Sequence, residues 1–246
     1  MNPEIITLVE EKCAIRILSI EKMFSRRNAV WLVHARDPGD NRLKYVVKVC
    51  AQSNAEQESA ILKRLCDWGV AVPAVKWSNH DIIVMEFING IVLADLMDQA
   101  EAVKTGDWIK PLACWLYQLH NVRETAGKVL CVPDLNLRNF INDGKAIVGL
   151  DFDEMIWDVP ERDLGGISAY ILNSSPMFTS EKYRAVGRLV KCYEEMREIN
   201  RTLIRDYLWR EMQAAAERRA AQRDYLLSKI EELQGLDIFS LEMSGD

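Results

Sequence analysis

The sequence predicts an α+β protein of two lobes, with a β-rich first lobe and a mainly helical second lobe. Three observations lead to this expectation. Residues 14–87 show mostly the apolar–polar alternation of strands, interrupted by one stretch with helical spacing. A turn at Asn89-Gly90 ends this pattern, and from Asp163 onward the spacing is almost entirely helical. The length of 246 residues also fits two closely joined lobes.

Five strands and one helix are expected in the first lobe, residues 1–87. Strand-like runs cover residues 14–21, 29–35, 44–50, 73–77 and 81–87. The turn Pro38-Gly39-Asp40-Asn41 indicates a hairpin between the second and third runs. Residues 54–68 gather their apolar side chains on one helical face. We therefore expect a five-stranded antiparallel sheet with one helix.

Residues 88–246 are expected to form the helical second lobe. A helix is predicted over residues 108–121, and a short β region that ends with the strand 147–152 follows it. A single long helix is predicted over residues 200–234, with many charged side chains in its middle. It would be a solvated helix packed at its two ends, a protruding arm for a partner protein or a second copy of the chain, or a lid over substrate.

Composition narrows the class of protein. Hydrophobic residues make up 49% and charged residues 28%, a globular balance, and the net charge of −6 argues against a nucleic-acid binder. No apolar run is long enough for a membrane span, and residues 1–12 lack the pattern of a signal peptide. The six cysteines have no C-x-x-C spacing and lie among apolar neighbours. We expect buried free thiols in a cytoplasmic protein.

Two neighbouring segments of the second lobe concentrate oxygen-bearing side chains. Asp134 and Asn139 lie on a loop that enters a strand, and a second strand runs into Asp151-Phe152-Asp153. A β-hairpin between these segments would bring Asn139 close to Asp151. Amide and carboxylate oxygens are ligands that Mg²⁺ prefers, and a carboxylate beside a hydroxyl can accept its proton. Taken alone, Asp134 and Asn139 also fit ordinary turn chemistry.

A lysine interrupts an apolar strand of the first lobe. Lys48 follows Tyr45-Val46-Val47, much as the lysine does in the V-A-I-K signature. Because an unpaired buried charge is costly, Lys48 needs a partner, and Glu58 lies ten residues later in the predicted helix. We expect the two to pair. The alternatives are a lysine on an edge strand and a glutamate in water.

These motifs, in this order, resemble those of the aminoglycoside phosphotransferase family, whose pattern choline kinases and some lipopolysaccharide kinases share. The resemblance spans about residues 24–172 and includes an interlobe linker at residues 84–90. Asp158 to Leu164 also matches the family, and Asp163 is expected to cap the helix that follows. The resemblance implies the bilobal protein-kinase-like fold, with a nucleotide bound between the lobes.

The resemblance also implies the catalytic and metal-binding residues. Asp134 would be the catalytic residue, because it would orient the acceptor hydroxyl and take its proton. Asn139 and Asp151 would bind Mg²⁺, and Asp153 would assist the metal or support its loop. His120, at the end of a Leu-His helix, is expected to be a packed structural residue rather than a catalyst.

The nucleotide-binding residues follow from the same resemblance. Lys48, held by Glu58, would steady the α- and β-phosphates. Glu86 and Phe87 lie in the linker, where the backbone would bind the base. Asn28 matches the family's turn into the second strand.

Two departures from the family affect these segments. The loop of residues 24–30 has no glycine, although glycine lets a backbone approach phosphates closely. Arg26 and Arg27 would contact phosphates by charge instead, or would be exposed surface. Val132-Pro133 stands where the family usually has His-Gly before the catalytic aspartate.

The leading prediction is an enzyme that uses ATP or GTP with Mg²⁺ and transfers the γ-phosphoryl group to a hydroxyl of a small molecule. One alternative is an atypical compact protein kinase, although no A-P-E segment follows Asp151. The other is a nucleotide-binding pseudokinase that acts through a partner. The sequence does not identify the acceptor.

Overall fold

The computed structural model describes residues 1–25, 27–51, 54–97, 106–132, 134–152, 155–236 and 238–239. The chain divides into two units. The first comprises Met1–Asn89 with Gly149–Glu154, and the second comprises Gly90–Val148 with Met155–Asp246. The short segment of residues 149–154 therefore groups with the first unit, although the sequence analysis assigned it to the second lobe.

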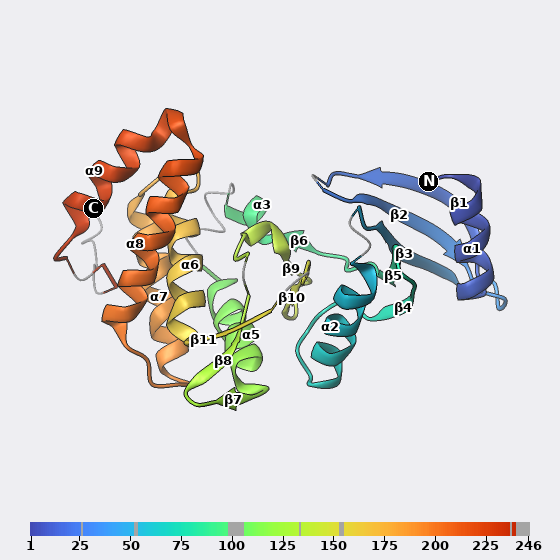
Figure 1. Cartoon of the computed structure of the whole chain (residues 1–246), viewed down its shortest axis with the longest axis horizontal. Coiled ribbons are helices and arrows are strands. Elements are labelled where there is room, and N and C mark those ends of the chain that lie inside the picture. Colours follow the sequence, from blue (N-terminus) through green and yellow to red (C-terminus); the bar gives the residue numbers. More distant parts are fainter. Residues whose placement is uncertain are drawn as a thin grey trace. The chain divides into compact units, whose positions relative to one another are not determined.

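A five-stranded antiparallel sheet forms the first unit, in the order β1-β2-β3-β5-β4 (Figure 1). Its strands are β1 (Arg16–Met23), β2 (Ala29–Arg36), β3 (Arg42–Val49), β4 (Val75–Ser78) and β5 (Ile82–Glu86). The hairpin between β2 and β3 closes where the Asp37 amide donates to the Asn41 carbonyl at 3.1 Å. The five-stranded antiparallel sheet predicted from the sequence is confirmed.

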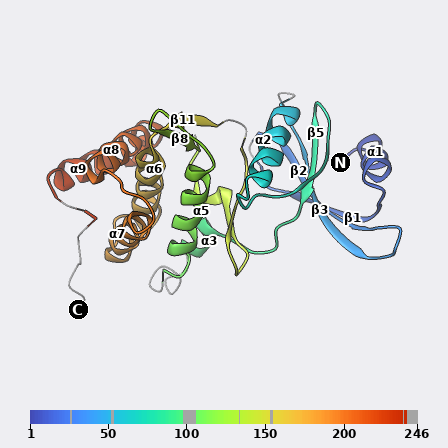
Figure 2. The same cartoon turned by 90° about the horizontal axis from the view of Figure 1, so that it is seen from below.

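Two helices cover opposite faces of this sheet, α1 (Pro3–Cys13) and α2 (Ala55–Asp67) (Figure 2). Because neighbouring residues of a strand point to opposite faces, Val47 packs in the cluster under α1 while Lys48 faces α2. The helix α1 was not predicted from the sequence. Its start signals are nevertheless present, since Asn2 Oδ1 accepts from the Ile5 amide at 2.9 Å and Pro3 is the first helical residue.

Helices predominate in the second unit. Its helices are α3 (Leu93–Met97), α5 (Ile109–Asn121), η1 (Leu137–Asn139), α6 (Pro160–Asn173), α7 (Ser180–Glu194), α8 (Arg201–Arg218), η2 (Ala220–Gln222) and α9 (Arg223–Leu233). Two small sheets accompany them, with the orders β10-β9-β6 and β11-β8-β7. Their strands are β6 (Ile91–Val92), β7 (Glu124–Thr125), β8 (Lys128–Cys131), β9 (Phe140–Asn142), β10 (Ile147–Gly149) and β11 (Ile156–Asp158). α6 packs against α7 and α8, and α5 packs against α7.

The single helix predicted over residues 200–234 is wrong. α8 ends at Arg218, and α9 folds back along it, so that the two helices meet in a corner at the top of Figure 1. The backbone leaves the helical region at Arg219, with φ −120° and ψ 72°. Residues 201–234 contain neither glycine nor proline, so the sequence carries no signal for a break here. Most of the predicted solvated middle, residues 213–223, is exposed, whereas Ala215 and Ala216 are buried.

Neither membrane spans nor disulfides are found in the described structure. No helix among the described residues is long and apolar enough to cross a membrane. The cysteines are free, and their exposure varies: Cys13, Cys50 and Cys131 are buried, Cys114 and Cys192 are half-buried, and Cys66 is exposed. The expectation that all six would be buried is therefore wrong for Cys66, on the outer face of α2.

The close contact between α6 and α8 depends on Gly165. A Cβ atom at this position would lie 2.6 Å from the Ile204 carbonyl oxygen and 2.6 Å from Tyr207 Cβ, both in α8. We expect Gly165→Ala to lower the free energy of unfolding by about 1–3 kcal/mol, because the two helices must separate. Urea denaturation measures this change.

The neighbouring glycine provides the matched control. A Cβ atom at Gly166 would lie 2.6 Å from Leu135 Cδ1, at the end of a flexible side chain. Gly166→Ala should cost less, because the Leu135 side chain can move aside, whereas a Cβ atom at Gly165 meets backbone atoms of α8. If Gly166→Ala were the more destabilising of the two, the assignment of the tight contact to Gly165 would be wrong.

Candidate functional site

A buried ion pair lies between the sheet and α2. Lys48 is 6% exposed, and its Nζ lies 2.8 Å from Glu58 Oε1 and 2.7 Å from Oε2. Glu58 is 1% exposed and occupies the first turn of α2, on the face that the helix turns to the sheet. The pair expected from the sequence is present.

Asp151 completes this cluster in the first unit. Its Oδ1 lies 2.5 Å from Lys48 Nζ, and its side chain is 47% exposed. The strand expected over residues 147–152 ends at Gly149, and Asp151 has a left-handed backbone with φ 62°. That conformation costs roughly 1 kcal/mol or more for a residue with a side chain. The Gly149 amide, which donates to the Ala71 carbonyl at 3.0 Å, and the buried Phe152 hold the segment in place.

The two carboxylates keep Lys48 charged. Burial alone would lower the pKa of Lys48, but attraction to Glu58 and then to Asp151 outweighs it and raises this pKa above its ordinary value. A raised lysine pKa contributes stability that is fully present below the unfolded-state pKa and is lost as the pH rises through the folded-state value. At neutral pH Lys48 is therefore charged, and its charge is balanced by the buried Glu58 and the half-exposed Asp151.

The other nucleotide-binding candidates also belong to the first unit. Asn28 Oδ1 accepts from the Ala51 amide at 3.1 Å, which ties the turn before β2 to the end of β3. The Glu86 amide donates to the Ala74 carbonyl at 2.9 Å, and the Lys44 Nζ lies 5.3 Å from the Phe87 ring centroid. These contacts shape the local backbone, and the predicted nucleotide contacts of Asn28, Glu86 and Phe87 stay predictions. Arg26 lies outside the described residues.

The predicted catalytic loop lies in the second unit. Asn139 Nδ2 donates to the Asp134 carbonyl at 3.4 Å, and Asn136 Oδ1 accepts from the Arg138 amide at 2.9 Å. Leu137 is fully buried beneath the loop. The Asp134 side chain is exposed, and no described residue binds its carboxylate. A carboxylate in this state is available to an acceptor hydroxyl.

A buried hydrogen-bond network holds the backbone at Val132, two residues before Asp134. Asp163 Oδ2 accepts from the Val132 amide at 3.0 Å and lies 3.1 Å from His120 Nε2, while His120 Nδ1 lies 2.7 Å from the Tyr193 hydroxyl. Because a carboxylate only accepts, Nε2 carries the proton. His120 is fully buried, which confirms it as a packed residue.

Asp163 does not cap α6, so that prediction is wrong. The helix begins at Pro160, and Asp163 lies in its first turn with its side chain directed to the catalytic loop. Sequence reasoning missed this role. The Leu-His and Asp-Leu landmarks that contain His120 and Asp163 were the available signal, but nothing in their spacing connects them.

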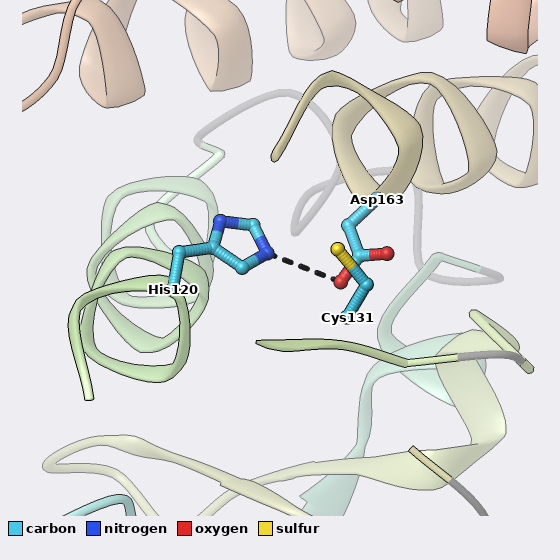
Figure 3. Close-up of side chains that lie close together, drawn as sticks. All are labelled: His120, Cys131 and Asp163. Atoms are coloured by element: carbon cyan, nitrogen blue, oxygen red, sulfur yellow. Dashed lines mark hydrogen bonds and ion pairs between the residues drawn. The ribbon is translucent and has the colours of Figure 1, made fainter. Parts of the chain in front are cut away.

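Cys131 adjoins the same network, and its sulfur lies within 4.8 Å of the ligand atoms of His120 and Asp163 (Figure 3). Hydrogen bonds account for this cluster without a metal. Burial raises the pKa of the Cys131 thiol, which disfavours the thiolate that metals bind, and the thiol donates to the Val159 carbonyl at 3.6 Å. We therefore interpret the cluster as a support for the catalytic loop.

The carboxylate of Asp151 and the amide of Asn139 offer the type of oxygen ligand that Mg²⁺ prefers. Asp151 uses Oδ1 for Lys48, and no described residue binds its Oδ2, which leaves a carboxylate oxygen for a hard cation. Asn139 offers an amide oxygen in the second unit, so its convergence with Asp151 stays a prediction. Asp153 and Pro133 lie outside the described residues.

Comparisons with known proteins agree with the predicted fold. Residues 6–156 match the family model of the RIO domain. No curated protein sequence matches the chain. Among solved structures, the macrolide 2'-phosphotransferase MphH from Brachybacterium faecium has a TM-score of 0.64 at 13% identity and covers 97% of this chain and 95% of its own.

Two further structures are similar. Spectinomycin phosphotransferase APH(9)-Ia, in complex with ADP and spectinomycin, has a TM-score of 0.62 at 15% identity, with 96% of this chain and 95% of that chain covered. A choline/ethanolamine kinase family protein from Mesorhizobium loti has a TM-score of 0.57 at 15% identity, with 91% and 90% covered. At such identities the similarity shows the fold, and the predicted protein-kinase-like fold is confirmed.

The buried pair can be tested without any ligand. Lys48→Met leaves Glu58 buried without its cation, and we expect a loss of about 3–5 kcal/mol in the free energy of unfolding. The double variant Lys48→Met/Glu58→Met should recover much of that loss, because apolar side chains of similar length replace both charges. Urea denaturation with Lys63→Met, an exposed lysine of α2, is the control. A double variant no more stable than Lys48→Met would contradict the pairing argument.

The Asp163 network can be tested at the Val132 amide. Asp163→Ala removes the acceptor of two buried donors, and we expect a loss of about 3 kcal/mol or more in stability. Asp163→Asn keeps an acceptor oxygen and should lose less. Amide hydrogen exchange at Val132 should be faster in Asp163→Ala than in Asp163→Asn. Equal exchange in the two variants would show that Asp163 does not hold the loop.

Proposed function

We propose that this chain, which belongs to the RIO domain family, is a small-molecule phosphotransferase. Its structural neighbours are phosphotransferases and kinases, which supports phosphoryl transfer. It would use ATP or GTP and transfer the γ-phosphoryl group to an alcohol. The neighbour complex with ADP and spectinomycin supports a nucleotide co-substrate.

The observation that carries the proposal is the clamped lysine. Lys48 lies between Glu58 and Asp151, at 2.8 Å and 2.5 Å from their nearest hydrogen-bonded oxygens. Such a cation has lost its side-chain freedom before any ligand arrives, so little entropy remains to be lost when it binds phosphates. Phosphoryl transfer depends mainly on positioning and charge, which this cluster provides.

The proposed step divides its parts among named residues. The acceptor oxygen bonds to the γ-phosphorus as the bond from that phosphorus to the nucleoside diphosphate breaks, and Asp134 takes the hydroxyl proton. Asn139 and Asp151 would hold Mg²⁺, which supplies positive charge that offsets the phosphate oxygens. Lys48 steadies the phosphates, and the network under Val132 keeps Asp134 in position.

Two isosteric variants separate nucleotide binding from chemistry. Asp151→Asn removes a carboxylate of the proposed metal site and should weaken the stabilisation that ATP with Mg²⁺ gives in thermal unfolding. Asp134→Asn should keep that stabilisation and lower ADP release with an accepted alcohol by roughly 10²–10⁴-fold, because general-base catalysis contributes about that much. Both are compared with wild type at equal magnesium.

The outcomes distinguish the alternatives. Equal loss of nucleotide binding in both folded variants would overturn the division of roles. Nucleotide binding by wild type with no turnover across a panel of sugars, amino alcohols and nucleosides would favour the pseudokinase. Labelled phosphate that appears on protein instead of small molecules would favour a protein kinase. No stabilisation by ATP or GTP would contradict the proposal as a whole.

A further inference from the structure

A pocket of about 700 Å³ lies entirely within the second unit. Its walls come from α3, η1, the end of α6 with the segment that follows, and the corner between α8 and α9 seen at the top of Figure 1. The volume is in the range of small-molecule sites. Arg138 of η1 contributes to its wall, four residues after Asp134.

Alanine and methionine side chains line this pocket together with two arginines and several neutral polar residues. Arg138 and Arg219 are its charged residues, and the described lining contains no carboxylate. Among the described residues, the Arg138 side chain pairs only with Asp95, at 3.6 Å, and both side chains are more than half exposed. Pairs of this kind contribute little, so Arg138 is readily available to a ligand.

Arg219 is bound to backbone and to no described carboxylate. Its Nη1 donates to the Asn173 carbonyl at 3.0 Å, at the end of α6. This leaves most of the donors of a guanidinium to other partners. An arginine held at one nitrogen, beside a pocket without acids in its described lining, is a ready site for a carboxylate or phosphate.

Two polar residues of the lining, Asn173 and Ser174, lie at the end of α6 and directly after it. Asn173 is 4% exposed, and its Oδ1 has no hydrogen-bond donor in the described part of the chain. Ser174 Oγ donates to the Ile171 carbonyl at 2.9 Å and accepts from Lys182 Nζ at 2.7 Å. A buried acceptor without a donor costs about 1–3 kcal/mol, which a ligand hydroxyl would relieve.

The helix break at Arg219 supports a functional reading. Residues 213–223 are mostly Ala, Arg, Glu and Gln, which favour a continuous helix, yet the chain turns at Arg219 and places residues 219–222 in the pocket wall. A place where the local sequence and the fold disagree is often a functional site. Here the disagreement brings a cation and a polar amide side chain to the pocket.

We propose that this pocket binds an acidic polyol, a small polyhydroxylated molecule with a carboxylate or phosphate group. Arg138 and Arg219 form ion pairs with the anionic group of the ligand, and the amide and hydroxyl side chains of the pocket form hydrogen bonds with the ligand's hydroxyls. The inference rests on the proposed function in one respect, since the bound molecule is then the acceptor whose hydroxyl Asp134 activates. The same arginines repel an amino alcohol or amino sugar, so the acceptor is acidic rather than cationic.

Binding to the nucleotide-free protein tests the pocket directly. A matched series of probes comprises glucuronate, glucose-6-phosphate, neutral glucose and cationic glucosamine, each measured by saturation-transfer NMR and thermal unfolding. We expect at least one of the two acids to bind more tightly than glucose and glucosamine. The acid that binds identifies the anionic group as carboxylate or phosphate.

Neighbouring arginines provide the variant and its control. Arg219→Gln should weaken binding of the preferred acid by roughly tenfold, because one charge-assisted contact is lost. Arg218→Gln should leave it unchanged, because Arg218 pairs with Glu211 at 2.7 Å and does not line the pocket. Neither variant should change stabilisation by ATP with Mg²⁺.

The failure of this inference is separable from that of the proposed function. If neither acid binds better than glucose, or if Arg219→Gln and Arg218→Gln behave alike, the acidic-polyol inference is overturned while nucleotide binding still stands. If the acid binds through Arg219 but the protein does not bind nucleotide, the pocket is supported as a binding site and the phosphotransferase proposal fails. ADP release that depends on the same acid supports both.

Discussion

The pairing of Lys48 with Glu58 is the interaction on which the geometry of the candidate site in the first unit depends. It joins the central strand β3 to α2 across a dry interface, since neither residue is more than 6% exposed. A buried ion pair is weak evidence of stability, because desolvation offsets much of the attraction. Its value here is positional. Because Glu58 fixes the position of Lys48 against α2, the carboxylate of Asp151 in the strained turn can form an ion pair with it, at 2.5 Å.

In the second unit, buried hydrogen bonds rather than an ion pair fix the position of the backbone that leads to Asp134. Asp163 accepts a hydrogen bond from the Val132 amide and is also bonded to His120, which in turn is bonded to the Tyr193 hydroxyl. The exposed Asp134 therefore follows a backbone that is anchored in the core, with Leu137 buried on its far side. Exposed reactive groups on rigid backbone are what a transfer reaction requires, because the reacting atoms must meet within a narrow geometry.

The sequence was most informative where chemistry and periodicity agreed. The five strands, α2, and the pairing of Lys48 with Glu58 were all predicted, because alternation fixes which face a strand residue takes and a buried lysine must find a carboxylate. The helix α1 was missed although Asn2 and Pro3 signal its start. The role of Asp163 was misread because a cap is a local interaction, whereas its actual partners, Val132 and His120, lie far away in the chain.

The break at Arg219 could not be predicted for a different reason. Helix propensity is a weak local preference, a few tenths of a kcal/mol per residue, and a single tertiary contact can outweigh it. One tertiary contact at the break is the bond from Arg219 to the Asn173 carbonyl, which joins the end of α6 to the corner of α8 and α9. No local pattern encodes such a contact.

The two cations of the candidate sites differ in how their charge is balanced. Lys48 is balanced by two carboxylates, so the folded protein satisfies it before a ligand arrives and its task is to hold position. Arg219 has only a carbonyl among its described partners, so its charge is balanced by solvent until an anion enters the pocket. In a chain whose net charge is −6, an arginine left without a carboxylate at a helix break is unexpected. Under the two proposals above, the pocket would therefore select the acceptor by its charge, while the lysine cluster would hold the phosphates of the nucleotide.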